Sequence, residues 1–76
     1  MIKIIMKRFA VESRALSSVG YNEKEKVLEV QFRKNPEVWQ YLEVGKRKYN
    51  AFIKSSSLGN YFTTKIKGKH PERRVE

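Results

Sequence analysis

The chain has 76 residues, no cysteine and no aspartate, and its 17 Lys and Arg against 8 Glu give a formal net charge of +9. This length predicts one domain with a modest core, and the lack of thiols excludes disulfides and thiolate chemistry. No apolar run approaches the roughly 20 residues that a membrane-spanning helix needs, so we expect a soluble, cytoplasmic protein with no membrane partner.

The first ten residues are predicted to form a loose N-terminal arm or a short edge strand, because Ile2, Ile4 and Met6 alternate along them. Residues 11–16 then predict a turn of helix, with Ser13 as its N-cap. The single folded domain is expected to extend from residue 11 to residue 70.

Three strands are predicted next, wherever β-branched and aromatic residues are concentrated. They cover residues 17–21, 27–33 and 38–44. The polar residues 22–26 form the first turn, and Asn35-Pro36 marks the second, because proline cannot lie inside a central strand. Gly20 is expected to allow the close approach of another backbone segment. The core side of the middle strand carries Leu28, Val30 and Phe32.

The register of the second hairpin decides which way the aromatic pair Trp39 and Tyr41 points. A regular even loop would place Trp39 opposite Phe32 and bury the pair. An odd loop or a bulge at the turn would instead bring Leu42 to the core side. We favour the second register, because it keeps the charged Glu43 away from the helices and leaves Trp39 and Tyr41 on the open face.

Two helices are predicted to follow the strands. The first covers residues 46–55, and the second begins near Leu58 and stops at Gly68. Their apolar stripes recur at helical spacing and consist of Tyr49, Phe52 and Ile53, and of Leu58, Phe62 and Ile66. We therefore predict an α+β fold, a three-stranded antiparallel meander followed by two helices packed on one face. Residues 71–76 are expected to be a loose basic tail.

Several segments, taken in order, resemble one known family. They are VESRALSSVGY, LEVQF, the aromatic pair in WQY, SLGNYF, and the basic ending KIKGKHPERRV. This order resembles the KTSC domain, named for its occurrence at the C-terminus of some lysyl-tRNA synthetases and also found as stand-alone small bacterial and phage proteins. The likeness covers residues 11–75, with Trp39 in place of the first Tyr of the family's YxY motif. The resemblance implies the fold. It also suggests RNA binding, because the family occurs fused to some tRNA synthetases.

The sequence differs from the family pattern at two places. Residues 34–37 make a longer hairpin turn than the short glycine-containing turn usual in the family, and Gly45 stands where the family often has proline. The first difference bears directly on the hairpin register. The second changes only how the first helix begins.

Catalysis and metal binding find little support in the residue types. His70 is the one histidine, and it lies beside a proline in a polar segment, where a solvated surface role is expected. With no cysteine and no aspartate, no cluster of metal ligands is expected. We predict a non-enzymatic protein with no cofactor and no bound metal.

Positive charge combined with exposed aromatic rings favours nucleic acid as the partner. Residues 45–76 alone carry a net +7, and rings on an open sheet face stack unpaired bases while Lys and Arg hold the phosphates. We predict that the protein binds RNA or single-stranded nucleic acid, with Trp39 and Tyr41 as the stacking platform. The predicted phosphate contacts form one set near an end of the sheet, Arg33, Lys34, Lys46, Arg47 and Lys48. A second set lies on the second helix and the tail, Lys65, Lys67, Lys69, Arg73 and Arg74.

A protein-interaction module is the alternative from a different class. An open face with Trp and Tyr also resembles a protein hot spot, and a basic surface suits an acidic protein partner, including a host protein that a phage-borne domain would inhibit. Pairing of two copies through the sheet is a related alternative, so both a monomer and a homodimer are expected states.

Overall fold

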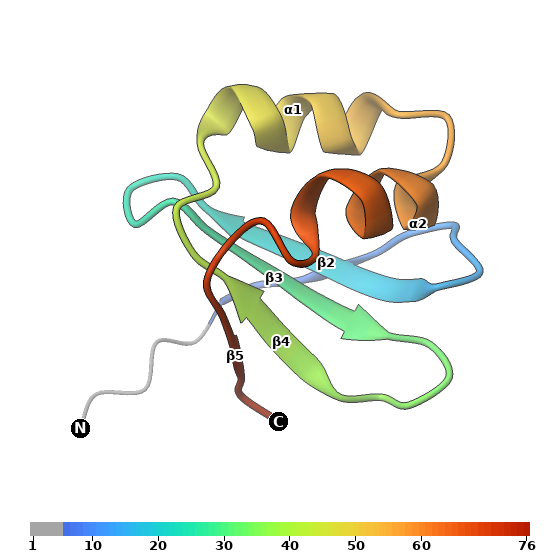
Figure 1. The fold of residues 1–76 in the computed structure, drawn as a ribbon. Helices are drawn as coiled ribbons and strands as arrows, with labels where there is room; N and C mark the ends of the chain where they lie inside the picture. Colours follow the sequence, from blue (N-terminus) through green and yellow to red (C-terminus); the bar gives the residue numbers. More distant parts are fainter. Residues whose placement is uncertain (1–5) are drawn as a thin grey trace.

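The fold is an antiparallel sheet with two helical segments on one face, as a computed structural model of the chain shows (Figure 1). The structure describes residues 6–76. Within them, five strands follow one another across the sheet in sequence order, β1 (Phe9–Ala10), β2 (Leu16–Asn22), β3 (Val27–Phe32), β4 (Val38–Tyr41) and β5 (Glu72–Arg74). The predicted α+β class is confirmed, and the predicted three-stranded meander is its centre, β2 to β4.

The helices form where the apolar spacing predicted them. Helix α1 (Lys46–Lys54) is followed by the short helix α2 (Leu58–Tyr61), which continues into a π-helical turn, η1 (Phe62–Ile66). The hydroxyl of Ser57 caps α2 by accepting a hydrogen bond from the Asn60 N–H at 3.2 Å. Gly68 has a φ of 79°, a conformation that favours glycine, and the helical segment ends there as the sequence predicts.

The core lies between the helices and the sheet. The helices contribute Phe52, Phe62 and Ile66, all at most 2% exposed. The sheet contributes fully buried side chains from its central strands, among them Val19, Leu28 and Val30. Burying this apolar area is the main source of stability in so small a domain.

The register of the β3–β4 hairpin contradicts the one that we favoured. Val30 pairs with Trp39 and Leu28 with Tyr41, so both rings lie on the face that the helices cover. The even-loop alternative predicted this side. It placed Trp39 opposite Phe32, however, and the observed partner Val30 lies two residues away. Glu43 does not constrain the register, because β4 already ends at Tyr41. Glu43 lies exposed in a turn with a φ of 60°.

Two other local predictions need correction. Residues 11–15 form no helix. The Ser13 hydroxyl does accept hydrogen bonds from the N–H groups of Ala15 and Leu16, both at 3.2 Å, but the chain then enters β2. The expected loose tail contains strand β5, which pairs with β4 by placing Glu72 opposite Tyr41. Main-chain hydrogen bonds therefore hold this segment.

The N-terminal segment crosses the sheet on the side away from the helices. A Cβ atom on Gly20 would lie 2.6 Å from the carbonyl oxygen of Lys7, so this glycine does allow the close approach that the sequence predicts. Of the ten residues predicted as an arm or edge strand, Phe9 and Ala10 form β1, and Ile2 and Ile4 lie outside the described residues. Over residues 6–76, no helix is long and apolar enough to span a membrane.

Candidate functional site

Tyr41 is not available for stacking. Its side chain is 1% exposed and meets Phe62 edge to face, with ring centroids 5.1 Å apart. Burial raises the pKa of its phenol to about 12, and the nearby Glu72 carboxylate adds to this shift. Tyr41 is therefore a core residue, and the predicted platform of two exposed rings does not exist.

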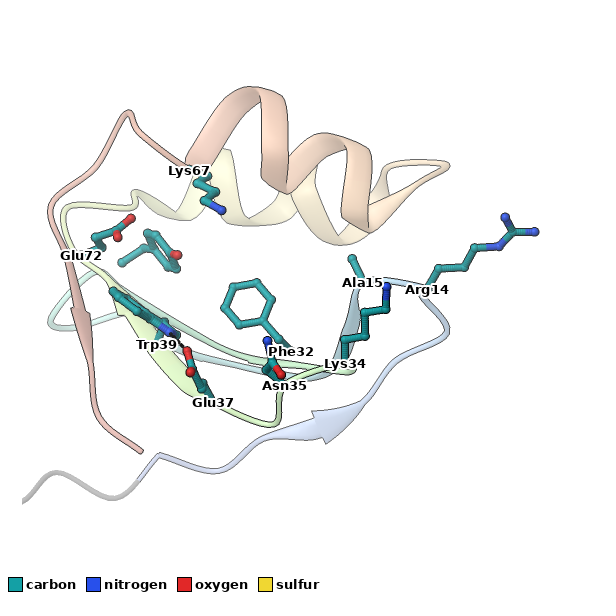
Figure 2. Close-up of a pocket in the computed structure, with 10 residues that line it drawn as sticks. Arg14, Ala15, Phe32, Lys34, Asn35, Glu37, Trp39, Lys67 and Glu72 are labelled. Carbon is teal, nitrogen blue, oxygen red and sulfur yellow. Dashed lines mark hydrogen bonds between the residues drawn. The ribbon is translucent and has the colours of Figure 1, made fainter.

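Trp39 is half-buried and lines an open groove of about 540 Å³. The groove lies between the end of the helical segment and the β3–β4 hairpin, and Figure 2 shows Trp39 and Phe32 inside it. The indole Nε1 of Trp39 donates a hydrogen bond to Glu37 Oε1 at 3.1 Å, which fixes the orientation of the ring. A single aromatic residue of the predicted pair is thus still accessible.

Charged side chains from four segments surround this groove. Three of them are cations, Arg14 before β2, Lys34 in the hairpin connection and Lys67 after η1. Two are carboxylates, Glu37 in the same connection and Glu72 on β5. Of these lining residues, Lys34, Lys67 and Trp39 were predicted from the sequence as binding residues. The other members of the site were not predicted, namely Arg14, Phe32, Glu37 and Glu72.

Three of the predicted phosphate-binding arginines are already engaged by the protein itself. Arg33 donates to the carbonyl oxygens of Val11, Ser13 and Leu16 at 2.8 to 3.2 Å, and so holds the segment before β2. Arg73 donates to Gln40 Oε1 at 2.7 Å. Arg74 donates to the Glu76 carbonyl at 3.2 Å and lies 3.8 Å from the Glu37 carboxylate.

The cations at the start of α1 lie at the opposite end of the sheet from Arg33 and Lys34, so the predicted first set is not one patch (Figure 1). Lys46 forms an ion pair with Glu23 in the β2–β3 turn at 2.9 Å, and this hydrogen bond raises the pKa of the Lys46 ammonium. Arg47 is exposed on α1. Lys65 and Lys69 are exposed as well, but they do not line the groove with Lys67.

The single histidine, His70, is half-buried and is not the solvated surface residue that was predicted. His70 Nδ1 lies 3.0 Å from the carbonyl oxygen of Leu42, and Nε2 lies 2.8 Å from the ammonium of Lys48. These partners indicate a neutral ring that donates through Nδ1 and accepts through Nε2. His70 therefore joins the segment before β5 to α1.

The sheet face opposite the helices carries polar side chains in place of aromatic ones. Glu29 and Gln40, each 4% exposed, are joined by a 2.8 Å hydrogen bond. Arg8 from the N-terminal segment forms an ion pair with the other oxygen of Glu29, and Arg73 reaches Gln40 from β5. This network covers the centre of the face, so of the predicted aromatic pair it is Trp39, in the groove, that remains open to a ligand.

A family model and a solved structure indicate the same family. The KTSC domain family model matches residues 12–70. A crystal structure of a KTSC domain protein from Yersinia pestis is similar, with a TM-score of 0.88 and 36% identity, over 95% of this chain and 100% of that one. An uncharacterized protein of Stutzerimonas stutzeri strain A1501 is 34% identical over 65 residues, 86% of this chain and 90% of that protein. The chain belongs to the KTSC domain family.

Proposed function

We propose that this protein is a non-enzymatic module that binds RNA or other single-stranded nucleic acid, with the Trp39 groove as its site. One observation carries the proposal, the half-buried indole of Trp39 in a groove lined by three cations. Among the described residues, Arg14, Lys34 and Lys67 form no ion pair with a carboxylate. Cations left without an internal partner beside an aromatic ring suit a ligand that combines phosphate with a base.

The size of the groove suits a single nucleotide. Sites for small ligands span about 300 to 1,000 Å³, and this groove of about 540 Å³ falls within that range. A base stacked on an aromatic ring contributes about 1 to 3 kcal/mol, and phosphates on Lys and Arg supply the part of the affinity that salt weakens. The net charge of +9 speeds the encounter with any polyanion. A cytoplasmic location belongs to this proposal, because RNA is encountered there.

Fluorescence provides the test, because Trp39 is the only tryptophan. We expect a single-stranded RNA oligonucleotide to quench Trp39 emission at low salt. Replacing both Lys34 and Lys67 by Gln is expected to lower the salt slope of binding by about two, one for each lost phosphate contact. The matched control replaces the exposed Lys24 and Lys54 by Gln, which removes the same charge away from the groove and leaves the slope nearly unchanged. Unchanged emission at low salt would rule out the groove as the site.

A protein-interaction module remains the second candidate, and one feature favours it. Phe9 is 50% exposed on β1, a strand at the edge of the sheet. Exposed sheet edges with apolar side chains pair readily with another strand, from a second copy or from a different protein. Unquenched Trp39 together with a concentration-dependent dimer in sedimentation would favour this candidate over nucleic-acid binding.

A further inference from the structure

The groove that we propose for nucleic acid also contains two carboxylates, which phosphate would repel. Glu37 has partners inside the protein, since it accepts from the Trp39 indole and lies 3.8 Å from Arg74. Glu72 is exposed and lines the groove, and among residues 6–76 it has neither an ion-pair partner nor a side-chain hydrogen bond. Its carboxylate is therefore free to accept hydrogen bonds from a ligand.

Sheet geometry places Glu72 within reach of a ring stacked on Trp39. Glu72 pairs with Tyr41 and Arg74 with Trp39, so Glu72 and Trp39 are diagonal neighbours on the same face. Diagonal neighbours in antiparallel strands lie about 7 to 8 Å apart. Figure 2 shows Glu72, Trp39 and Lys67 toward one end of the groove, with Lys34 and Arg14 at the other. The first end combines a carboxylate, suited to hydrogen-bond donors, with a cation, and the second carries two cations, suited to phosphate.

The chemistry of the bases decides which one suits a carboxylate. A carboxylate only accepts hydrogen bonds, and it accepts two side by side most favourably. On its Watson–Crick edge, guanine presents N1–H and N2–H as adjacent donors, whereas each of the other bases places an acceptor next to its donor. Single-stranded RNA is recognised through this same edge by proteins that stack its bases.

We propose that the groove selects an unpaired guanine, with its ring against Trp39 and its Watson–Crick edge on the Glu72 carboxylate. This inference rests on the proposed nucleic-acid function and adds a base preference to it. Lys34, Lys67 and Arg14 then hold the adjacent phosphates. We assign the preference for guanine to Glu72 and not to Glu37, because the Glu37 carboxylate already accepts a hydrogen bond from the indole.

The test compares RNA pentamers of uridine whose central base is guanine, hypoxanthine, adenine or uracil, by Trp39 quenching at low salt. We expect the guanine pentamer to bind about tenfold more tightly than the adenine pentamer, the size expected for one good bidentate contact. Hypoxanthine keeps N1–H but lacks the N2 amino group, so its pentamer is expected to bind between the two. In Glu72→Gln the preference for guanine over adenine should fall below about threefold.

The control variant is Glu25→Gln, which removes one negative charge from the exposed β2–β3 turn and should keep the full preference. Equal binding of all four pentamers would overturn the guanine proposal and leave the nucleic-acid function standing. A preference that survives in Glu72→Gln would also overturn it, because Glu72 would not be the group that reads the base. If no pentamer quenches Trp39, both the function and the preference fail.

Discussion

The centre of the sheet is covered on both faces, by the helices on one and by the N-terminal segment on the other, but the buried side chains differ. Under the helices, Val30 and Tyr41 pack against Phe62 in an apolar core. Under the N-terminal segment, Glu29 and Gln40 are 4% exposed and satisfied by hydrogen bonds. Apolar burial contributes net stability, whereas a buried polar network chiefly fixes which groups meet. The protein's own side chains thus fill the centre of each face, and the candidate site lies at the edge of the helical cover.

The largest effect is expected from Phe62→Ala, which removes the ring at the centre of the helix-covered face. Phe62 is 2% exposed and meets both Phe32 and Tyr41 edge to face. Truncating a buried Phe costs about 3 to 5 kcal/mol, a large part of the total stability of a domain this small. Urea unfolding followed by circular dichroism measures it. Thr63→Ala, on the exposed side of the same segment, should change the free energy of unfolding by less than about 0.5 kcal/mol.

An alkaline transition of Tyr41 provides the second comparison. Its pKa is about 12 in the folded state and 10.0 when unperturbed, so the unfolded chain loses its proton first as the pH rises. The stability that the protonated Tyr41 phenol contributes is therefore fully present below pH 10. It is lost between pH 10 and pH 12, at about 1.4 kcal/mol per pH unit. Tyr21 and Tyr49 also have raised pKa values through burial, so the wild type and Tyr41→Phe must be compared.

Tyr41→Phe is expected to keep more of its stability than the wild type between pH 10 and pH 12, as urea unfolding at each pH would measure. The control is Tyr61→Phe, which removes a hydroxyl from a half-buried ring on α2 and should leave the alkaline loss in place. If Tyr41→Phe and the wild type lose stability in parallel, the Tyr41 phenol is not held in the apolar core.

The two faces also differ in how far the sequence predicted them. The spacing of Phe52, Phe62 and Ile66 identified both helical segments and the side that they bury. The side of the sheet that they cover depended on where β4 ends. A left-handed turn at Glu43, with a φ of 60°, is uncommon for a residue other than glycine, and nothing in the sequence indicated it.

The candidate site was only partly predictable, for a related reason. Strand β5 consists of Glu72, Arg73 and Arg74, which carry no apolar alternation, and it forms through main-chain hydrogen bonds to β4. Without β5, Glu72 cannot be placed beside Trp39. The groove is assembled from four segments, residues 14–15, 32–41, 67 and 72, so no single local motif marks it. In the sequence, the net positive charge and Trp39 were the features that indicated a binding site.

The polar face is expected to give the smallest of these effects, with Glu29→Gln as the change. Glutamine keeps the size of the side chain but removes the charge that pairs with Arg8. It also replaces one of the two carboxylate oxygens, which accept separately from Arg8 and Gln40, by an NH₂ donor. Because Arg8 remains about a quarter exposed, water compensates part of the loss, and we expect a cost of about 1 to 2 kcal/mol in urea unfolding. The exposed Glu25→Gln provides the matched control and should cost less than about 0.5 kcal/mol. A loss as large as that of Phe62→Ala would mean that the polar network, and not the apolar core alone, holds this domain together.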